Sequence, residues 1–226
     1  MSVVVGVDGC AAGWVAVAWR GARVEARVFE TFDAVMAAWA DASVIGVDMP
    51  VGLVARGPRS ADAAARAYLA GSGRSASVFS VPPRRAVAAT TYAEACRRAL
   101  ADSGKQISQQ SFRLFAKIRE VDAYVADPRV VEVHPECSFA TMAGAPARRA
   151  NKKTWAGAAV RRALLAAAGL EVPAEFPGAD RVGLDDVLDA AAVAWTARRV
   201  SRGEARALPP APAEHDACGR LVQILA

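Results

Sequence analysis

Two aspartates each follow directly on a short hydrophobic run of the sequence. Asp8 ends the run 3–7 and Asp48 ends the run 44–47, and both are preceded by Gly-Val. Short β-branched runs of this kind predict buried strands. If the two strands are parallel neighbours, both carboxylates leave the sheet at one edge, where α/β proteins place their sites. Either aspartate alone could instead open a turn, but the repeated pattern favours a shared site.

A second pair of aspartates lies near the start of a predicted helix at 184–200. Asp186 and Asp189 are three residues apart and therefore share one helical face. Further along that face the residues are small or apolar, so the face is expected to pack on the core. An acid there is unfavourable unless it is paired or bound to a cation. The helix dipole accounts for Asp185 and Asp186 at the N-terminus, but less well for Asp189.

Glu132, His134 and Glu136 close a predicted strand at 130–133. Glu132 and His134 alternate onto one face of that strand, and Glu136 lies just beyond it. These residues are further candidates for acid and base chemistry or for substrate binding. A histidine at a strand end could equally be held by the backbone.

Several acids at one sheet edge would repel each other, and a bound divalent cation commonly offsets such repulsion. Mg²⁺ or Mn²⁺ accepts oxygen ligands and pairs with phosphate oxygens. Two such ions can hold a phosphodiester for in-line attack. The predicted metal ligands are Asp8, Asp48, Asp186 and Asp189, with Glu132 as a further catalytic acid.

Basic side chains suit a phosphate-containing substrate. The candidates are Arg59, Arg66, Lys117, Arg119, Arg148, Arg149, Lys152 and Lys153. Arg59, Asp62 and Arg66 share one helical face, which a surface ion-pair ladder would also explain. We predict instead that Arg66 points toward the acids and binds phosphate. Lys117 or an arginine of the middle segment would neutralise the phosphate charge.

The sequence pattern predicts a mixed sheet flanked by helices, an α/β architecture. Predicted strands are at 3–8, 14–20, 23–29, 43–48 and 130–133, and predicted helices at 31–41, 60–69, 92–100, 108–124, 154–168 and 184–200. The first three strands should form a meander, with 43–48 parallel to the first. The block 51–128 is predicted to be a helical insertion in a single domain covering 1–226. The segment 221–225 could be an edge strand or a short helix.

The composition is that of a folded protein with a modest positive charge. The chain has 226 residues, 54% of them hydrophobic, and 28 Lys+Arg against 23 Asp+Glu. This balance permits a polyanionic partner without requiring one. Four widely spaced cysteines predict reduced thiols in a cytoplasmic protein. No signal-peptide pattern and no apolar stretch near 18 residues, about the length of a membrane span, is found, so no membrane partner is expected.

Motifs along nearly the whole chain resemble those of the DUF429 family. The segments are Gly6-Val-Asp-Gly-Cys-Ala-Ala-Gly-Trp14, Val47-Asp-Met-Pro-Val-Gly-Leu53, Arg59-Ser-Ala-Asp62, Ser77-Val-Phe-Ser-Val-Pro82, Lys117-Ile-Arg-Glu-Val-Asp122, Glu132-Val-His-Pro-Glu136, Asn151-Lys-Lys153 and Asp186-Val-Leu-Asp189. The family is described as predicted nucleases with an RNase H-like fold. The resemblance implies an RNase H-like sheet with acids on its first and fourth strands and last helix, the places of Asp8, Asp48, Asp186 and Asp189. The last of these motifs is similar to that of Holliday-junction resolvases.

These observations predict a metal-dependent nuclease that uses Mg²⁺ or Mn²⁺ and acts on nucleic acid. Its predicted catalytic residues are Asp8, Asp48, Asp186, Asp189, Glu132 and Lys117, and its predicted substrate-binding residues are Arg59, Arg66, His134, Glu136, Lys152 and Lys153. One alternative is a nucleotide phosphoryl-transfer enzyme of the same superfold, as in sugar kinases, Hsp70 and actin. The other is a non-catalytic protein that binds a partner through the insertion.

Overall fold

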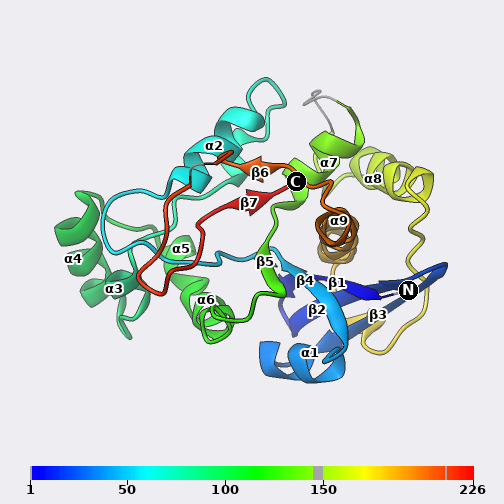
Figure 1. Cartoon of the computed structure of the whole chain (residues 1–226), viewed down its shortest axis with the longest axis horizontal. Coiled ribbons are helices and arrows are strands. Elements are labelled where there is room, and N and C mark those ends of the chain that lie inside the picture. Colours follow the sequence, from blue (N-terminus) through cyan, green and yellow to red (C-terminus); the bar gives the residue numbers. More distant parts are fainter. Residues whose placement is uncertain (1, 145–149, 212) are drawn as a thin grey trace.

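The centre of the molecule is a five-stranded mixed sheet with the strand order β3-β2-β1-β4-β5 (Figure 1). The structure is a computed structural model and describes residues 2–144, 150–211 and 213–226. The strands are β1 (Val3–Cys10), β2 (Gly13–Arg20), β3 (Arg23–Phe29), β4 (Ala42–Val47) and β5 (Val130–Glu132). The first three form an antiparallel meander, and β4 and β5 continue the sheet in parallel pairing. The predicted meander and the parallel pairing of the first and fourth strands are confirmed.

Both faces of the sheet are covered, which explains why β1 is a continuous apolar run. Val3, Val5 and Val7 face one core cluster, together with Phe32 and Phe115 from the helices below the sheet. Alternate residues face a second core cluster that contains most of the apolar side chains of the last helix. The predicted α/β class, a mixed sheet flanked by helices, is confirmed.

Helices cover both faces of the five-stranded sheet (Figure 1). One side is covered by α1 (Phe32–Ala38) and α6 (Phe115–Asp122), and the other by α9 (Leu184–Ser201), with α7 (Pro135–Met142) and α8 (Trp155–Ala167) packed beside it. The sequence analysis did not predict α7, because this helix is buried on nearly all sides and has no amphipathic period. Among the described helices, none combines the length and apolar character needed to cross a membrane.

The segment between β4 and β5 is largely helical, as predicted, and contributes to the core beneath the sheet. Its other helices are α2 (Ser60–Tyr68), α3 (Arg84–Val87), α4 (Tyr92–Ser103) and α5 (Gln109–Arg113), with a 3-10 turn at Ser75–Ser77. The predicted helix 108–124 is two helices, α5 and α6, joined at Leu114. Phe115 and Ile118 of α6 are fully buried in the core of the sheet, so the insertion shares that core.

The C-terminal tail returns to the sheet as a pair of two-residue strands. Strands β6 (Ala207–Leu208) and β7 (Ile224–Leu225) pair antiparallel, and Leu225 forms a parallel bridge with Val133 beyond the end of β5. Two alternatives were predicted for the segment 221–225, an edge strand and a short helix, and the structure has a strand at the end of this segment. A second 3-10 turn, at Ala179–Arg181, lies in the connection between α8 and α9.

Candidate functional site

Gly6 lets α9 lie directly against the sheet, and this close approach positions the acids. A Cβ atom at residue 6 would lie 2.0 Å from the backbone nitrogen of Ala194 and 2.2 Å from the carbonyl oxygen of Ala190. Only glycine fits such a contact between a strand and a helix. The first turns of α9 consequently lie beside Asp8, two residues further along β1.

Asp8 and Asp48 are neighbours at the edge shared by β1 and β4. Val7 pairs with Val47 in the parallel ladder, and the backbone nitrogen of Asp48 donates to the carbonyl oxygen of Val7 over 2.9 Å. Asp8 is buried, and its Oδ1 accepts a hydrogen bond of 2.7 Å from the backbone nitrogen of Gly9. The two strand ends identified in the sequence therefore do deliver their carboxylates to one place.

Four carboxylates, two from the strands and two from α9, interact electrostatically at this edge. Burial first, and then the charges of Asp48, Asp189 and Asp186, raise the pKa of Asp8 well above its usual range. Burial and then Asp189 likewise raise the pKa of Asp48, while the ammonium of Lys152 lowers it in part. Asp186 is partly exposed, and burial followed by Asp185 raises its pKa less strongly. The site holds more negative charge than its surroundings balance.

Lys152 supplies the cation that the acids share. Its Nζ lies 2.5 Å from Oδ2 of Asp189 and 3.7 Å from Oδ2 of Asp185. Burial raises the pKa of Asp189 to about 6, although Lys152 opposes this shift. Burial lowers the pKa of Lys152, but the carboxylates of Asp189, Asp8 and Asp185 together outweigh burial, and the net direction is upward. The pKa of Asp189 thus rises because the carboxyl is buried, and that of Lys152 rises because its ammonium faces several carboxylates.

The chemistry of the donors fits a hard divalent cation. All four acids offer oxygen ligands, and the buried Oδ1 of Asp189 has no hydrogen-bond partner among the described residues. In the described part of the chain, however, no group of three His, Cys, Asp or Glu side chains is placed to hold an ion together. The ammonium of Lys152 lies among the carboxylates in this arrangement. Binding of an ion would therefore require Lys152 to leave Asp189.

Glu132 and Arg59 form a buried ion pair behind the acid site. Arg59 Nη2 lies 2.5 Å from Oε2 of Glu132, which also accepts a 2.8 Å hydrogen bond from the backbone nitrogen of Val51. Arg59 also lies 3.7 Å from Asp62, and only 1% of it is exposed. Burial raises the pKa of Glu132 to about 7 against the opposing effect of Arg59. Arg59 is thus the partner of Glu132, and the predicted phosphate-binding role of Arg59 is corrected.

Arg66 stabilises a loop of the insertion through two hydrogen bonds. Its Nε donates to the carbonyl oxygen of Val78 over 3.0 Å, and its Nη2 donates to Oγ of Ser80 over 2.8 Å. None of its described hydrogen bonds reaches an acid of the site. The prediction that Arg66 points toward the acids is therefore not supported, and neither is the surface ladder, because Arg59 and Asp62 are buried.

Lys117 lies next to the acid site but is already engaged. Its side chain passes so close to Gly9 that a Cβ there would lie 2.9 Å from the lysine Cδ. Its Nζ donates to the carbonyl oxygen of Gly13 and lies 4.5 Å from the ring centroid of Trp14. These contacts hold Lys117 on the face of the sheet that α6 covers, and among the described residues it forms no ion pair with an acid of the site.

Glu136 and His134 lie at the start of α7. Glu136 is buried and accepts a 2.6 Å hydrogen bond from Nη2 of Arg161, an arginine on the otherwise apolar buried face of α8. The charge of Glu136 contributes to the raised pKa values of Asp48 and Asp189. Burial lowers the pKa of His134. Glu136 thus acts on the acid site through its field, and the sequence held no signal that paired it with Arg161.

The two lysines near residue 150 differ in their surroundings, because one forms ion pairs and the other is exposed. Lys152 is bound to the acids, whereas Lys153 is exposed, and its backbone nitrogen donates to Asn151 Oδ1 over 3.1 Å. Arg148 and Arg149 lie outside the described residues. Of the basic residues predicted to contact substrate, Lys152 is therefore the one that the structure brings to the acids.

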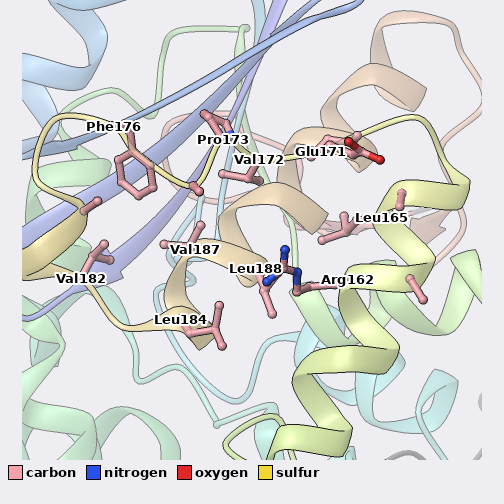
Figure 2. A pocket seen from close by; sticks show the side chains of 15 residues that line it. Arg162, Leu165, Glu171, Val172, Pro173, Phe176, Val182, Leu184, Val187 and Leu188 are labelled. Carbon is pink, nitrogen blue, oxygen red and sulfur yellow. The ribbon is translucent and has the colours of Figure 1, made fainter.

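A separate cavity of about 670 Å³ lies between α8, α9 and the segment 170–182 (Figure 2). Its lining is mostly apolar, with Leu184 and Leu188 contributed by α9 and Arg162 by α8. At 100° per residue, Leu184 lies about 160° around α9 from Asp186, on nearly the opposite side of the helix. The cavity is therefore not part of the acid site.

Comparison with known proteins places the motifs of this chain in one family. The family described as "Protein of unknown function (DUF429)" matches residues 6–214. That range includes all four aspartates of the acid site, the pair Arg59–Glu132 and the lysine that the acids share. No curated protein and no solved structure matches the chain.

Proposed function

Because the chain belongs to the DUF429 family, whose description assigns no activity, we propose its function from the site: metal-dependent hydrolysis of phosphodiester bonds in nucleic acid. The observation that carries this proposal is the convergence of Asp8, Asp48 and Asp189, all with pKa values raised by burial and by neighbouring carboxylates. A fold retains an excess of buried negative charge only at a cost. Perturbed carboxylates grouped in this way are typical of functional sites.

The topology supports the same proposal. The resemblance to the DUF429 family implies acids on the first strand, the fourth strand and the last helix, and Asp8, Asp48, Asp186 and Asp189 lie on or directly after β1, β4 and α9. The net charge of +5 is compatible with a polyanionic substrate. Such a substrate would bring phosphate to a site that is itself acidic, which requires a cation between them.

Asp8, Asp48 and Asp189 would hold that cation, with Asp186 at the partly exposed rim. When bound, Mg²⁺ or Mn²⁺ ions would supply the activated water and the stabilisation of the leaving oxygen. When no ion is bound, Lys152 offsets part of the carboxylate charge, and after leaving Asp189 its ammonium would become available to a substrate phosphate. Lys117 carries a further positive charge beside the backbone of Gly9, on the face of the sheet that α6 covers.

The test is cleavage of a labelled panel of single-stranded DNA, duplex DNA, RNA and branched junctions in Mn²⁺, Mg²⁺ or EDTA. We expect metal-dependent cleavage by the wild type and none by Asp8→Asn, which removes one buried charge and should fold at least as stably without metal. Asp180→Asn, an exposed aspartate outside the site, is the matched control and should cleave normally. Cleavage by Asp8→Asn at the wild-type rate would overturn the assignment. Hydrolysis of ATP without any cutting would favour the phosphoryl-transfer alternative.

A further inference from the structure

Trp155, the first residue of α8, projects into solvent. It is 88% exposed, whereas the other exposed large hydrophobic residues of the described chain are 44–52% exposed. Thr154 is the N-cap of the helix and accepts a hydrogen bond from the backbone nitrogen of Gly157, so the position of Trp155 is fixed by a formed helix end. A large aromatic surface held open on a rigid element is available for stacking contact with a ligand.

Two lysines closely precede this indole in the chain. Lys152 precedes it by three residues and reaches Asp189 at the acid site over 2.5 Å. Lys153 is exposed beside it, and the first turn of α8 contains no acidic residue. Charge complementarity therefore favours a polyanion at this surface, and the chain connects the surface directly to the acid site.

We propose that Trp155 stacks on an unpaired base of the substrate, so that the substrate is single-stranded or branched nucleic acid rather than continuous duplex. This inference rests on the proposed function. Aromatic platforms bind bases of any sequence because every base has a π face. In a continuous duplex both faces of each base are already covered by neighbouring bases, so a side chain on the protein surface has no base face to contact.

The same face of α8 continues toward a second basic residue. Arg162 lies seven residues after Trp155, about two helical turns, and therefore on the same side of α8. It lines the apolar cavity beside α9 and makes no hydrogen bond or ion pair with the described residues (Figure 2). At 1.5 Å per residue Arg162 lies about 10 Å from Trp155 along the helix axis, so it would offer a phosphate contact to a strand that follows this face.

The experiment compares the affinities of Trp155→Ala, Trp155→Phe and Leu100→Ala for labelled single-stranded and duplex oligonucleotides. All three are made in the Asp8→Asn background in Mn²⁺, so that the probe is not consumed, and wild-type cleavage is measured in parallel. Leu100 is 51% exposed on α4 and serves as the control for loss of an exposed apolar side chain. Because Trp155 is exposed, its removal should leave the thermal melting curve unchanged.

We expect Trp155→Ala to weaken single-strand binding roughly tenfold or more, with duplex affinity changed less than about twofold, and Trp155→Phe to retain most of the binding. Unchanged single-strand affinity, or an equal loss for both probes, overturns the inference while the nuclease proposal stands. If the loss appears instead in self-association of the protein, Trp155 is an interface between copies and the inference also fails. If the wild type neither binds nor cuts any probe, the proposed function fails first.

Discussion

Asp189→Asn should stabilise the metal-free protein at pH 8 and leave its stability at pH 4 unchanged. Asp189 is 3% exposed, and burial raises its pKa from 3.8 to about 6. The folded chain therefore binds this proton more tightly than the unfolded chain does. Stability consequently falls as the pH rises from 3.8 to about 6 and stays low above that range. At about 1.4 kcal/mol per pKa unit, the ionised Asp189 lowers the free energy of unfolding by roughly 3 kcal/mol at pH 8.

Asparagine has nearly the same shape, cannot ionise, and can still accept the hydrogen bond from Lys152. Urea denaturation in EDTA should give a free energy of unfolding higher by up to about 3 kcal/mol than that of the wild type at pH 8, with the difference vanishing near pH 4. Added Mn²⁺ should stabilise the wild type and not the variant. Asp180→Asn should shift stability by less than about 0.5 kcal/mol at either pH. A variant that is less stable at pH 8, or an advantage independent of pH, would refute the reasoning.

Three further substitutions test how the site is held. Gly6→Ala places a Cβ 2.0 Å from the α9 backbone and should cost more than about 4 kcal/mol or prevent folding, which circular dichroism melts will show. Arg59→Met leaves the Glu132 carboxylate buried and unpaired and should cost about 3–5 kcal/mol in urea denaturation, most of it recovered when Glu132→Leu is added. Arg66→Ala removes two bonds to the loop 78–80 and should cost about 1–2 kcal/mol without changing the salt dependence of nucleic-acid binding. If Arg66→Ala melts normally but its affinity for nucleic acid depends less steeply on salt concentration, Arg66 contacts the substrate phosphate as the sequence analysis predicts.

Local sequence patterns were enough to predict the strands and the placement of the two strand-end aspartates. The apolar runs before Asp8 and Asp48 have the short, β-branched pattern of buried strands, and such patterns depend only on neighbouring residues. The same local reasoning placed Asp186 and Asp189 on one face of the last helix, because 100° per residue is a property of the helix alone. The structure agrees with both predictions.

Helix boundaries were predicted less well where the environment overrides periodicity. The predicted helix 108–124 divides at Leu114 into α5 and α6; the fully buried residues belong to α6, whereas Phe112 of α5 packs against the same core only partly buried. Helix α7 escaped prediction because a helix buried on nearly all sides carries no alternation of polar and apolar faces.

The pairing of the charged residues depends on the fold and not on local sequence. Arg59 and Glu132 are 73 residues apart, Glu136 and Arg161 are 25 apart, and Lys152 and Asp189 are 37 apart. An arginine suited to phosphate is equally suited to a buried carboxylate, so the residue type could not separate the two roles of Arg59. These two roles are distinguished only by burial and by the register between distant elements. Burial and register determine which partner lies next to each charge and how strongly water screens their interaction.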